Sequence, residues 1–461
     1  MFAITLVSPA FNFLYSLPIC RIHSKLLKDF RQNQIHVHRH VHRIAIYIID
    51  HFSEKTPFYR PTRDSKVIFV LSIYISDTTL VKEIEMLPDS VPSREKSIQQ
   101  LNRACKAIQQ TAPYSPITNN SKAHQIYTVR RYNFAVCLVP KAGCSFVKQL
   151  VHFLNYQSLI NDPPTEELSD ELSEIKPVFN LSRKLVHRIL DFENVTIPIS
   201  NFTREQNLIK VVMVRNPYSR LFSAYVDKIF IPHLWRKLIG YKYMLNDTFN
   251  DTICELLRHE TFESFLQQIV WEPDLENWDK HWLPVHNLCD PCNAQPHLII
   301  HQETYNEDIK MLLQKTGILK SERTILNKYM AKYGVQNRQT LKGLIVTTYS
   351  IGVSQCRHCL TRFEMAERVW KALQIQGQVL QRSLFPKNKL YNITDLDAEQ
   401  VSEILLAEID KAPISSKEAH AQRDQALRLA YRNVSKSVLK EIQNIFSYDF
   451  QIFGYDMDPP I

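Results

Sequence analysis

The stretch NFAVCLVPKAGCSFVKQLVHFL, residues 133–154, contains three consecutive patterns that indicate a strand, a loop and a helix. Asn133–Val139 is a short apolar run of the kind that forms a buried parallel strand. Phe146–Leu154 repeats apolar residues at helical spacing along one stripe. Between them lies the loop Pro140–Ser145, which contains Lys141. The stretch therefore predicts an α/β fold with a polar loop at the end of a core strand.

A second stretch, LIKVVMVRNPYSRLFSAYVDKI at residues 208–229, repeats this arrangement. Leu208–Val214 predicts another buried strand, and Pro217 suits the first turn of a helix that follows it. Pro296–His301 predicts a third strand. About 70 residues separate the first two units, which is enough for a crossover between parallel strands. We therefore expect a central parallel sheet flanked by helices.

The two loops carry groups that suit phosphate. A helix start offers unpaired backbone N–H groups and a partial positive charge, Lys141 adds a point charge, and Ser145 adds a hydroxyl. The GxxxxGK[ST] pattern of nucleotide triphosphate loops is absent, so a 5′-phosphate that carries a sulfonate fits better. In the second unit, Arg215 at a strand end, Arg220 and Ser223 suit a terminal phosphate monoester.

Composition narrows the class of partner. The chain has 461 residues, 44% of them apolar, and a net charge of +9, which together predict a sizeable core and an anionic partner. Eight sequons for N-glycosylation, about two to three times the chance number, favour a lumenal protein and weigh against nucleic acid. These sequons are Asn119, Asn180, Asn194, Asn201, Asn246, Asn250, Asn392 and Asn433.

Four motifs in order resemble one known family. VPKAGCSFVKQL and VVMVRNPYSRLFSAYVDK are similar to the 5′-phosphosulfate loop and the 3′-phosphate site of the Golgi carbohydrate sulfotransferases. HWLPVHNLCDPC (His281–Cys292), followed by ETYNED (Glu303–Asp308), and YDFQIFGY (Tyr448–Tyr455) resemble further segments of that family. The group that they resemble contains the chondroitin/dermatan N-acetylgalactosamine 4-O-sulfotransferases and the glucuronyl 3-O-sulfotransferase.

The resemblance implies a P-loop-like sulfotransferase fold and 3′-phosphoadenosine-5′-phosphosulfate as the donor. Lys141 would contact the bridging oxygen and the leaving 5′-phosphate, Ser145 and the loop amides would hold that phosphate, and the 3′-phosphate would lie elsewhere, on Arg215 and Ser223. The predicted donor-binding residues are Pro140, Lys141, Ala142, Gly143, Cys144, Ser145, Arg215, Arg220 and Ser223. The family normally has a Trp in the loop region where this chain has Ser145-Phe146-Val147-Lys148.

A catalytic base must take the proton of the acceptor hydroxyl. His281 is the first choice, with His286 and Glu303 in reserve, and a purely structural His281 is the competing interpretation. The chemistry requires no metal. Two Cys-X-X-Cys pairs, Cys289/Cys292 and Cys356/Cys359, are expected to form disulfides or serve mixed roles, with zinc as the alternative.

The expected organisation has four parts. Residues 1–20 are a weak signal or membrane anchor, because the basic residues follow the apolar run. Residues 21–125 are expected to be a poorly ordered stem, and 126–455 the sulfotransferase domain. Within that domain, 319–425 is expected to be a helical insertion, since the family places fewer residues there. The resemblance implies a single-pass type II protein of the Golgi membrane with a lumenal catalytic domain.

The expected activity is transfer of a sulfuryl group to a hydroxyl of a glycan, such as a glycosaminoglycan like chondroitin or a glycoprotein glycan. The alternative is a glycan-binding protein that keeps the fold without catalysis. A P-loop kinase would need a full triphosphate loop and a magnesium carboxylate, and neither motif is present. The sequons and the Cys-X-X-Cys segment argue against a cytosolic sulfotransferase for small hydrophobic acceptors.

Overall fold

The structure is a computed structural model. It describes residues 94–111, 126–161, 195–235, 251–320, 323, 326, 338–391, 393 and 395–461. The expected anchor, most of the expected stem and six of the eight sequons lie outside these residues. Asn201 and Asn433, the two described sequons, are exposed, as a glycan acceptor must be.

One sheet forms the centre of the described part, with strands in the order β3-β1-β2-β4-β5. β2, β4 and β5 are parallel, which confirms the three predicted core strands to within a few residues at each end. The two strands at one end of the sheet, β3 and β1, differ from the expected parallel arrangement, because β1 pairs antiparallel with both β2 and β3. The strands are β1 (Ile126–Val129), β2 (Phe134–Cys137), β3 (Thr196–Ile197), β4 (Ile209–Val214) and β5 (Leu298–His301).

The antiparallel pairing of β1 with β2 has a local cause. A short 3-10 turn at Arg130–Tyr132 joins β1 directly to β2, and Asn133 closes it with a left-handed backbone at φ 47°. So short a connection can join only antiparallel strands, since a parallel pair needs a crossover of a dozen or more residues. The sequence predicted the crossovers of the core but did not predict this hairpin.

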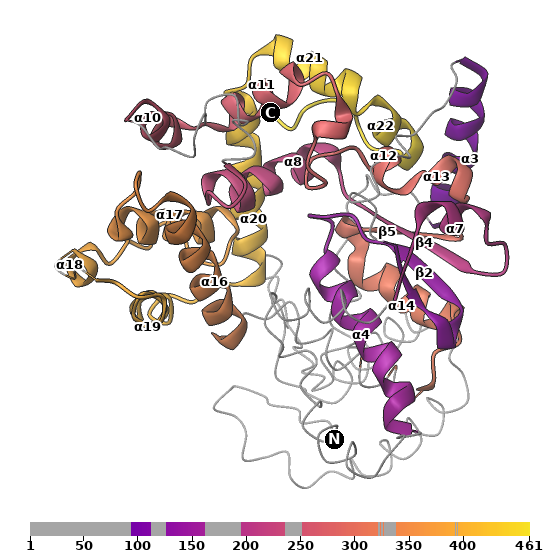
Figure 1. The fold of residues 1–461 in the computed structure, drawn as a ribbon, viewed down its shortest axis with the longest axis horizontal. Coiled ribbons are helices and arrows are strands. Elements are labelled where there is room, and N and C mark those ends of the chain that lie inside the picture. Colours follow the sequence, from indigo (N-terminus) through magenta and orange to yellow (C-terminus); the bar gives the residue numbers. More distant parts are fainter. Residues whose placement is uncertain are drawn as a thin grey trace, which may run out of the picture. The chain divides into compact units, whose positions relative to one another are not determined.

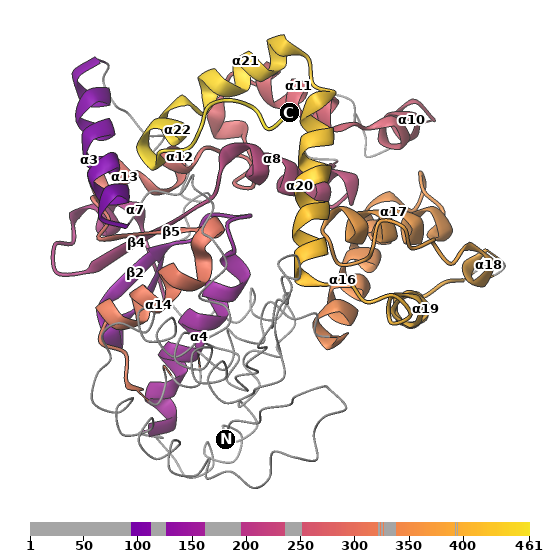
Figure 2. The same cartoon turned by 180° about the vertical axis from the view of Figure 1, so that it is seen from behind.

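Helices cover both faces of the sheet (Figures 1 and 2). α4 and α14 lie on one side, and α3, α7 and α13 lie on the other. The residues of β2 are fully buried and those of β4 nearly so, which suits apolar strands covered on both faces. The helices are α3 (Arg94–Thr111), α4 (Cys144–Asn161), α7 (Ile199–Arg204), α13 (Pro291–Ala294) and α14 (Tyr305–Lys315).

Helix α3 corrects the expected stem, because residues 94–111 are ordered structure. Leu101, Cys105 and Ile108 are buried and recur at helical spacing, so one face of α3 packs against the domain. A disulfide joins Cys105 to Cys292, and the amide of Gln100 donates to the carbonyl of Gln451 at 2.8 Å. The domain therefore includes this helix.

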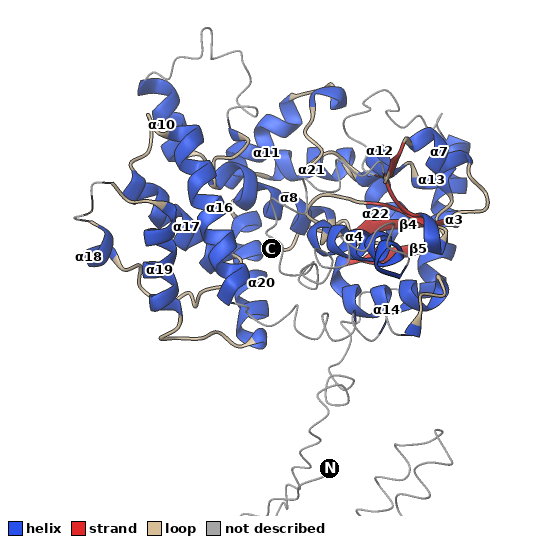
Figure 3. Ribbon diagram, turned by 60° about the horizontal axis from the view of Figure 1, so that its bottom comes forward, coloured by secondary structure: helices blue, strands red, loops and turns tan. Residues whose placement is uncertain are grey.

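The described residues between 319 and 425 are mainly helical, as predicted for this segment. Figure 3 shows helices and loops there, while the strands lie in the other part of the domain. That the segment is an insertion relative to the family stays a prediction. Its helices are α16 (Arg338–Cys356), α17 (Arg362–Ile375), α18 (Lys387–Leu390), α19 (Ala398–Ile409) and α20 (Ser416–Arg432).

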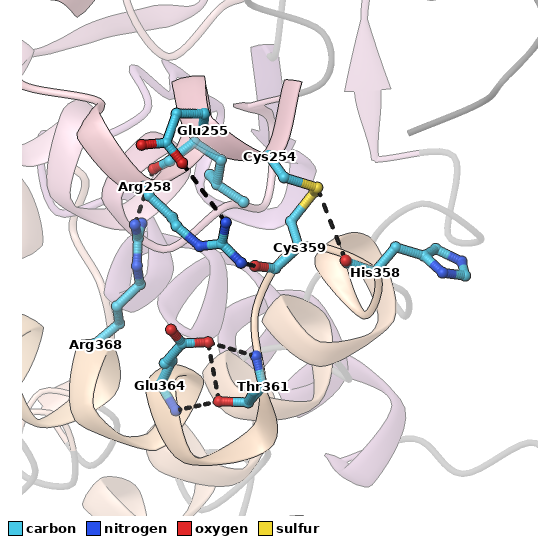
Figure 4. The surroundings of a disulfide bond; sticks show 9 residues. Cys254, Glu255, Arg258, His358, Cys359, Thr361, Glu364 and Arg368 are labelled. Carbon is cyan, nitrogen blue, oxygen red and sulfur yellow. Dashed lines mark hydrogen bonds and ion pairs between the residues drawn. A yellow bond between two sulfur atoms is a disulfide. The ribbon is translucent and has the colours of Figure 1, made fainter. Parts of the chain in front are cut away.

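A disulfide and two arginines tie this helical segment to the rest of the domain (Figure 4). Cys359 bonds to Cys254, which lies in α10 (Asp251–His259), and Arg258 donates to the carbonyl of Cys359 at 2.9 Å. Arg368 of α17 donates to the carbonyls of Phe230 and Leu257 at 3.0 and 2.9 Å.

Among the described residues, no helix combines the length and apolar character needed to cross a bilayer.

Candidate functional site

The two predicted loops meet where β2 and β4 end. These strands are parallel neighbours, with Cys137 opposite Val212, so their carboxyl ends lie at the same edge of the sheet. Arg215 follows β4, and its Nη1 donates to the carbonyl of Lys141 at 2.9 Å. The fold therefore joins two stretches that lie 74 positions apart in the chain.

The first loop has an unusual backbone. Lys141 has φ 71° and Gly143 has φ 88°, both in the left-handed region that side chains disfavour. A Cβ at Gly143 would also lie 2.9 Å from Cε2 of Tyr305, so only glycine fits without displacement. Gly143 directly precedes α4 and has no side chain that could cap the helix, so the first-turn amides suit an anionic ligand.

The ammonium group of Lys141 lies against a carboxylate. Its Nζ is 2.7 Å from Oδ2 of Asp227, and the side chains are only 9% and 14% exposed. Asp227 belongs to a π-helical turn, Val226–Phe230, and such turns are frequent at functional sites. Lys228, the next residue, lies 3.4 Å from the same carboxylate oxygen. The sequence alone indicates no role for Asp227, although this residue lies near the end of the second motif, next to Lys228.

The second loop is capped by its own side chain. In α8 (Pro217–Tyr225), the amides of Tyr218 and Ser219 donate to Oδ1 of Asn216 at 3.0 and 3.3 Å. Nε of Arg215 donates to the hydroxyl of Ser219 at 2.9 Å. Ser223 is one helical turn beyond Ser219 and partly exposed, so it lies on the same face of α8. That Arg215 and Ser223 bind a phosphate stays a prediction.

Glu303, one of the reserve bases, already has two hydrogen-bonding partners. One of its oxygens accepts from the backbone amide of Asn216 at 3.0 Å. The other accepts from the hydroxyl of Tyr455 at 3.0 Å, so the predicted C-terminal motif reaches the second loop. These contacts favour a supporting role for Glu303 over proton transfer.

Arg220 differs from expectation, because it points into the protein. Its side chain is 1% exposed, its Nε donates to the carbonyl of Pro140 at 3.1 Å, and its Nη2 donates to the carbonyl of Lys280 at 3.0 Å. Burial lowers the pKa of Arg220 to about 10, so it stays charged at neutral pH. Two of its three nitrogens are therefore committed to backbone contacts instead of the donor contacts that we predicted.

His281 forms a dyad with Asp279. Its Nδ1 lies 2.5 Å from Oδ1 of Asp279, and its backbone amide donates to the same oxygen at 3.1 Å. Burial lowers the pKa of His281 to about 4; Asp279 opposes the shift, and the positive charges of Lys228 and Lys141 add to it. The ring is therefore neutral at physiological pH. The hydrogen bond to Asp279 assigns the proton to Nδ1 and leaves Nε2 as an acceptor.

The other reserve base, His286, is held in the interior. Its Nδ1 lies 2.9 Å from Oδ1 of Asp449, in α22 (Ser447–Phe453). The same carboxylate accepts from the amides of Val285 and His286 at 2.6 and 2.9 Å, at the start of α12 (Val285–Cys289). Asp449 of the C-terminal motif thus supports the His281–Cys292 segment, and His286 has a structural position.

Disulfides fix the same segment to the sheet. Cys289 bonds to Cys137, the last residue of β2, and Cys292 bonds to Cys105 of α3. The disulfide expectation is thereby confirmed for this pair, and the sulfurs are not available to zinc. In the second pair, Cys359 bonds to Cys254, while Cys356 is a buried thiol. The connectivity of the cysteines depends on the tertiary fold, so their spacing in the sequence does not predict it.

Residues 124–344 match the family described as the Sulfotransferase family. This region of the chain is therefore similar to the sulfotransferase family. Carbohydrate sulfotransferase 14 of Danio rerio is 26% identical to it over 236 residues, which cover 47% of this chain and 56% of that protein. Carbohydrate sulfotransferase 11 of Mus musculus is 27% identical over 209 residues, covering 44% and 55%.

Carbohydrate sulfotransferase 10 of Rattus norvegicus is 26% identical over 252 residues, which cover 51% of this chain and 64% of that protein. The chain thus spans about half the length of the curated relatives it matches. No solved structure matches it. The family match includes both predicted donor loops and His281, and the C-terminal motif lies beyond it.

Proposed function

We propose that this chain transfers a sulfuryl group from 3′-phosphoadenosine-5′-phosphosulfate to a hydroxyl of a glycan. One observation carries the proposal: the Lys141 loop and Arg215 lie together at the carboxyl ends of two adjacent parallel strands. In α/β sheets this edge is where ligands bind. The names of the curated relatives, which are carbohydrate sulfotransferases, support the glycan acceptor.

The residues at this edge fit the two ends of the donor. The start of α4, with Ser145 and the amides of the loop, suits the 5′-phosphate, and Gly143 leaves room for an approaching ligand. Arg215 and Ser223 would hold the 3′-phosphate from the neighbouring loop. An ammonium group has three donor hydrogens, so Lys141 can keep its contact with Asp227 and also donate to the leaving oxygen.

In the proposed reaction, the acceptor oxygen forms a bond to sulfur while the bond from sulfur to the 5′-phosphate oxygen breaks. Negative charge develops on that phosphate oxygen, where Lys141 and the helix start stabilise it. Nε2 of His281 takes the hydroxyl proton, and Asp279 stabilises the imidazolium that results. No metal has a role in this mechanism.

The acceptor that we propose is a glycosaminoglycan such as chondroitin, or another glycoprotein glycan. The net charge of +9 suits a polyanionic chain. We also propose a lumenal location at the Golgi membrane as a single-pass type II protein. Three disulfides among the described residues, together with the sequons, support an oxidising, glycosylating compartment.

The decisive experiment measures transfer of radiolabelled sulfate from the donor to a panel of defined glycans. We expect transfer to at least one acidic glycan, and a fall in kcat of about 10²- to 10⁴-fold in His281→Asn. His259→Asn is the control, because His259 is an exposed histidine paired with Glu255 on α10. Glycan binding without any transfer would support the non-catalytic alternative.

The pH dependence tests the base separately. A base acts in its neutral form, and burial lowers the pKa of His281 to about 4. The acidic limb of kcat/KM should therefore have its midpoint near this value, well below the 6.5 or so of an ordinary histidine. A midpoint above about pH 6 would exclude the buried dyad as the base.

A further inference from the structure

The guanidinium of Arg220 connects the two halves of the proposed reaction centre. Its Nε donates to the carbonyl of Pro140, in the donor loop, at 3.1 Å. Its Nη2 donates to the carbonyl of Lys280, in the segment of the proposed base, at 3.0 Å. The two acceptors are 140 positions apart in the chain, and each directly precedes a residue to which we assign chemistry, Lys141 and His281.

These contacts act on the peptide planes of the following residues. A peptide unit is planar, so its carbonyl oxygen is rigidly related to the nitrogen of the next residue. By fixing the oxygen of Pro140, Arg220 orients the backbone that enters Lys141. By fixing the oxygen of Lys280, it orients the backbone that enters His281, whose amide also donates to Asp279.

The two hydrogen bonds of Arg220 are also strong enough to hold these segments in place. Arg220 is 1% exposed and carries a charge, and a hydrogen bond from a charged donor is stronger than one between neutral groups. Asp449 is the nearby carboxylate whose charge favours the protonated guanidinium. The fork of an arginine has a fixed geometry, so it sets the separation of two acceptors in a way that the flexible amine of a lysine does not.

We propose that Arg220 is a positioning residue that couples donor binding to the placement of the base. It holds the Lys141 loop and the His281 segment at a fixed separation, so that ordering one segment orders the other. This inference rests on the proposed function, because it assigns the two segments to the two sides of one transfer. The competing assignment is direct binding of a donor phosphate through Nη1, which has no hydrogen-bond partner among the described residues.

Hydrogen exchange tests the coupling without measuring transfer. The probe is 3′-phosphoadenosine-5′-phosphate, the desulfated product of the donor. In the wild-type protein it should slow amide exchange in 140–146 and, through Arg220, in 280–289. In Arg220→Lys the first effect should remain and the second should be lost. Protection of both segments in Arg220→Lys, to the wild-type extent, would overturn the proposal.

Kinetics separate positioning from direct binding. Arg220→Lys should lower kcat by about 10²-fold, the effect of a displacement near 1 Å, while the Kd of the nucleotide changes less than about 3-fold. As the His281 segment loosens and admits water, the acidic limb of kcat/KM should move upward toward about pH 6.5. A Kd that rises 10-fold or more, with kcat unchanged, would instead assign Arg220 to the phosphate.

Two further variants control for stability. Arg362→Lys removes an equivalent contact, since Arg362 donates to the carbonyl of Leu396 at 2.7 Å in the helical segment, and it should leave the pH profile and the exchange coupling unchanged. Arg220→Ala, assayed with added guanidinium, should regain part of its kcat. If the wild-type protein binds the nucleotide but transfers nothing, the proposed function fails, and the exchange experiment still decides the coupling.

Discussion

The loop after β2 and the loop after β4 both lead from a buried parallel strand into a helix, but they satisfy the start of that helix differently. In the first loop, Gly143 precedes α4 and offers no capping side chain, and the backbone at Lys141 and Gly143 is left-handed. In the second, Asn216 caps α8, and Pro217 has no amide proton to satisfy.

This difference separates two ways of binding a phosphate. The first loop offers backbone amides, supplemented by Lys141, so its binding depends on backbone shape. In the second loop the side chain of Asn216 already accepts hydrogen bonds from the amides of Tyr218 and Ser219. A phosphate at the second loop would therefore be held by the side chains of Arg215 and Ser223, as we propose. The two loops should therefore respond differently to equivalent substitutions.

The largest effect should come from Lys141→Met. Removing a donor that we propose is aimed at the developing charge should lower kcat by about 10²- to 10³-fold. The Kd of 3′-phosphoadenosine-5′-phosphate, measured by calorimetry, should change much less, since the amides and the second loop remain. A loss confined to Kd would mean that Lys141 serves binding alone.

Ser223→Ala and Ser145→Ala form a matched pair that tests the comparison directly. A hydrogen bond to a charged phosphate contributes about 1.5–3 kcal/mol, so Ser223→Ala should weaken nucleotide binding by about tenfold or more. Ser145→Ala should weaken nucleotide binding less, because in the first loop backbone amides also donate to the phosphate. Equal losses in the two variants would break the distinction between the loops.

Gly143→Ala should affect the first loop through its backbone. The new Cβ would lie 2.9 Å from the Tyr305 ring, at a φ of 88°. Strain of this kind costs about 1–3 kcal/mol, which should appear as a lower midpoint of chemical unfolding and weaker nucleotide binding. Gly317→Ala is the control, since Gly317 also has positive φ but nothing within 4 Å of its Cβ position. Weaker nucleotide binding should be specific to Gly143.

The smallest effect should come from Asn216→Ala. Loss of this cap should lower the free energy of unfolding by about 1 kcal/mol, and Asn216→Ser should restore most of it because serine also caps. Nucleotide binding should change little if the capped amides take no part in it. A large loss of affinity in Asn216→Ala, with normal stability, would show that the second loop also binds through its backbone.

Local signals explain what the sequence predicted correctly. Apolar runs located β2, β4 and β5, and Pro217 located the start of α8, because each depends on a few neighbouring residues. The pairing of Lys141 with Asp227 was missed because it joins positions 86 apart and depends on a π turn. The buried direction of Arg220 was missed for a similar reason, since its acceptors come from two other segments.

Helix α3 was missed although its apolar spacing is visible in the sequence. Its buried positions, Leu101, Cys105 and Ile108, lie among basic and amide residues, which we interpreted as a stem. The connection to Cys292 could not be read from cysteine spacing, because nine cysteines permit many pairings. The pairing of Cys105 with Cys292 depends on which face of the sheet α3 covers.

The bond between Cys105 and Cys292 also makes residues 105–292 a covalent ring. This ring spans 187 positions and includes both proposed phosphate loops and the dyad of His281 and Asp279. A protease that cuts once between Thr111 and Ile126 would sever the chain and still release nothing. The two pieces would migrate as one species on a non-reducing gel and separate only after a reductant opens the ring. Helix α3 therefore stays attached to the proposed catalytic residues even after its peptide connection is lost.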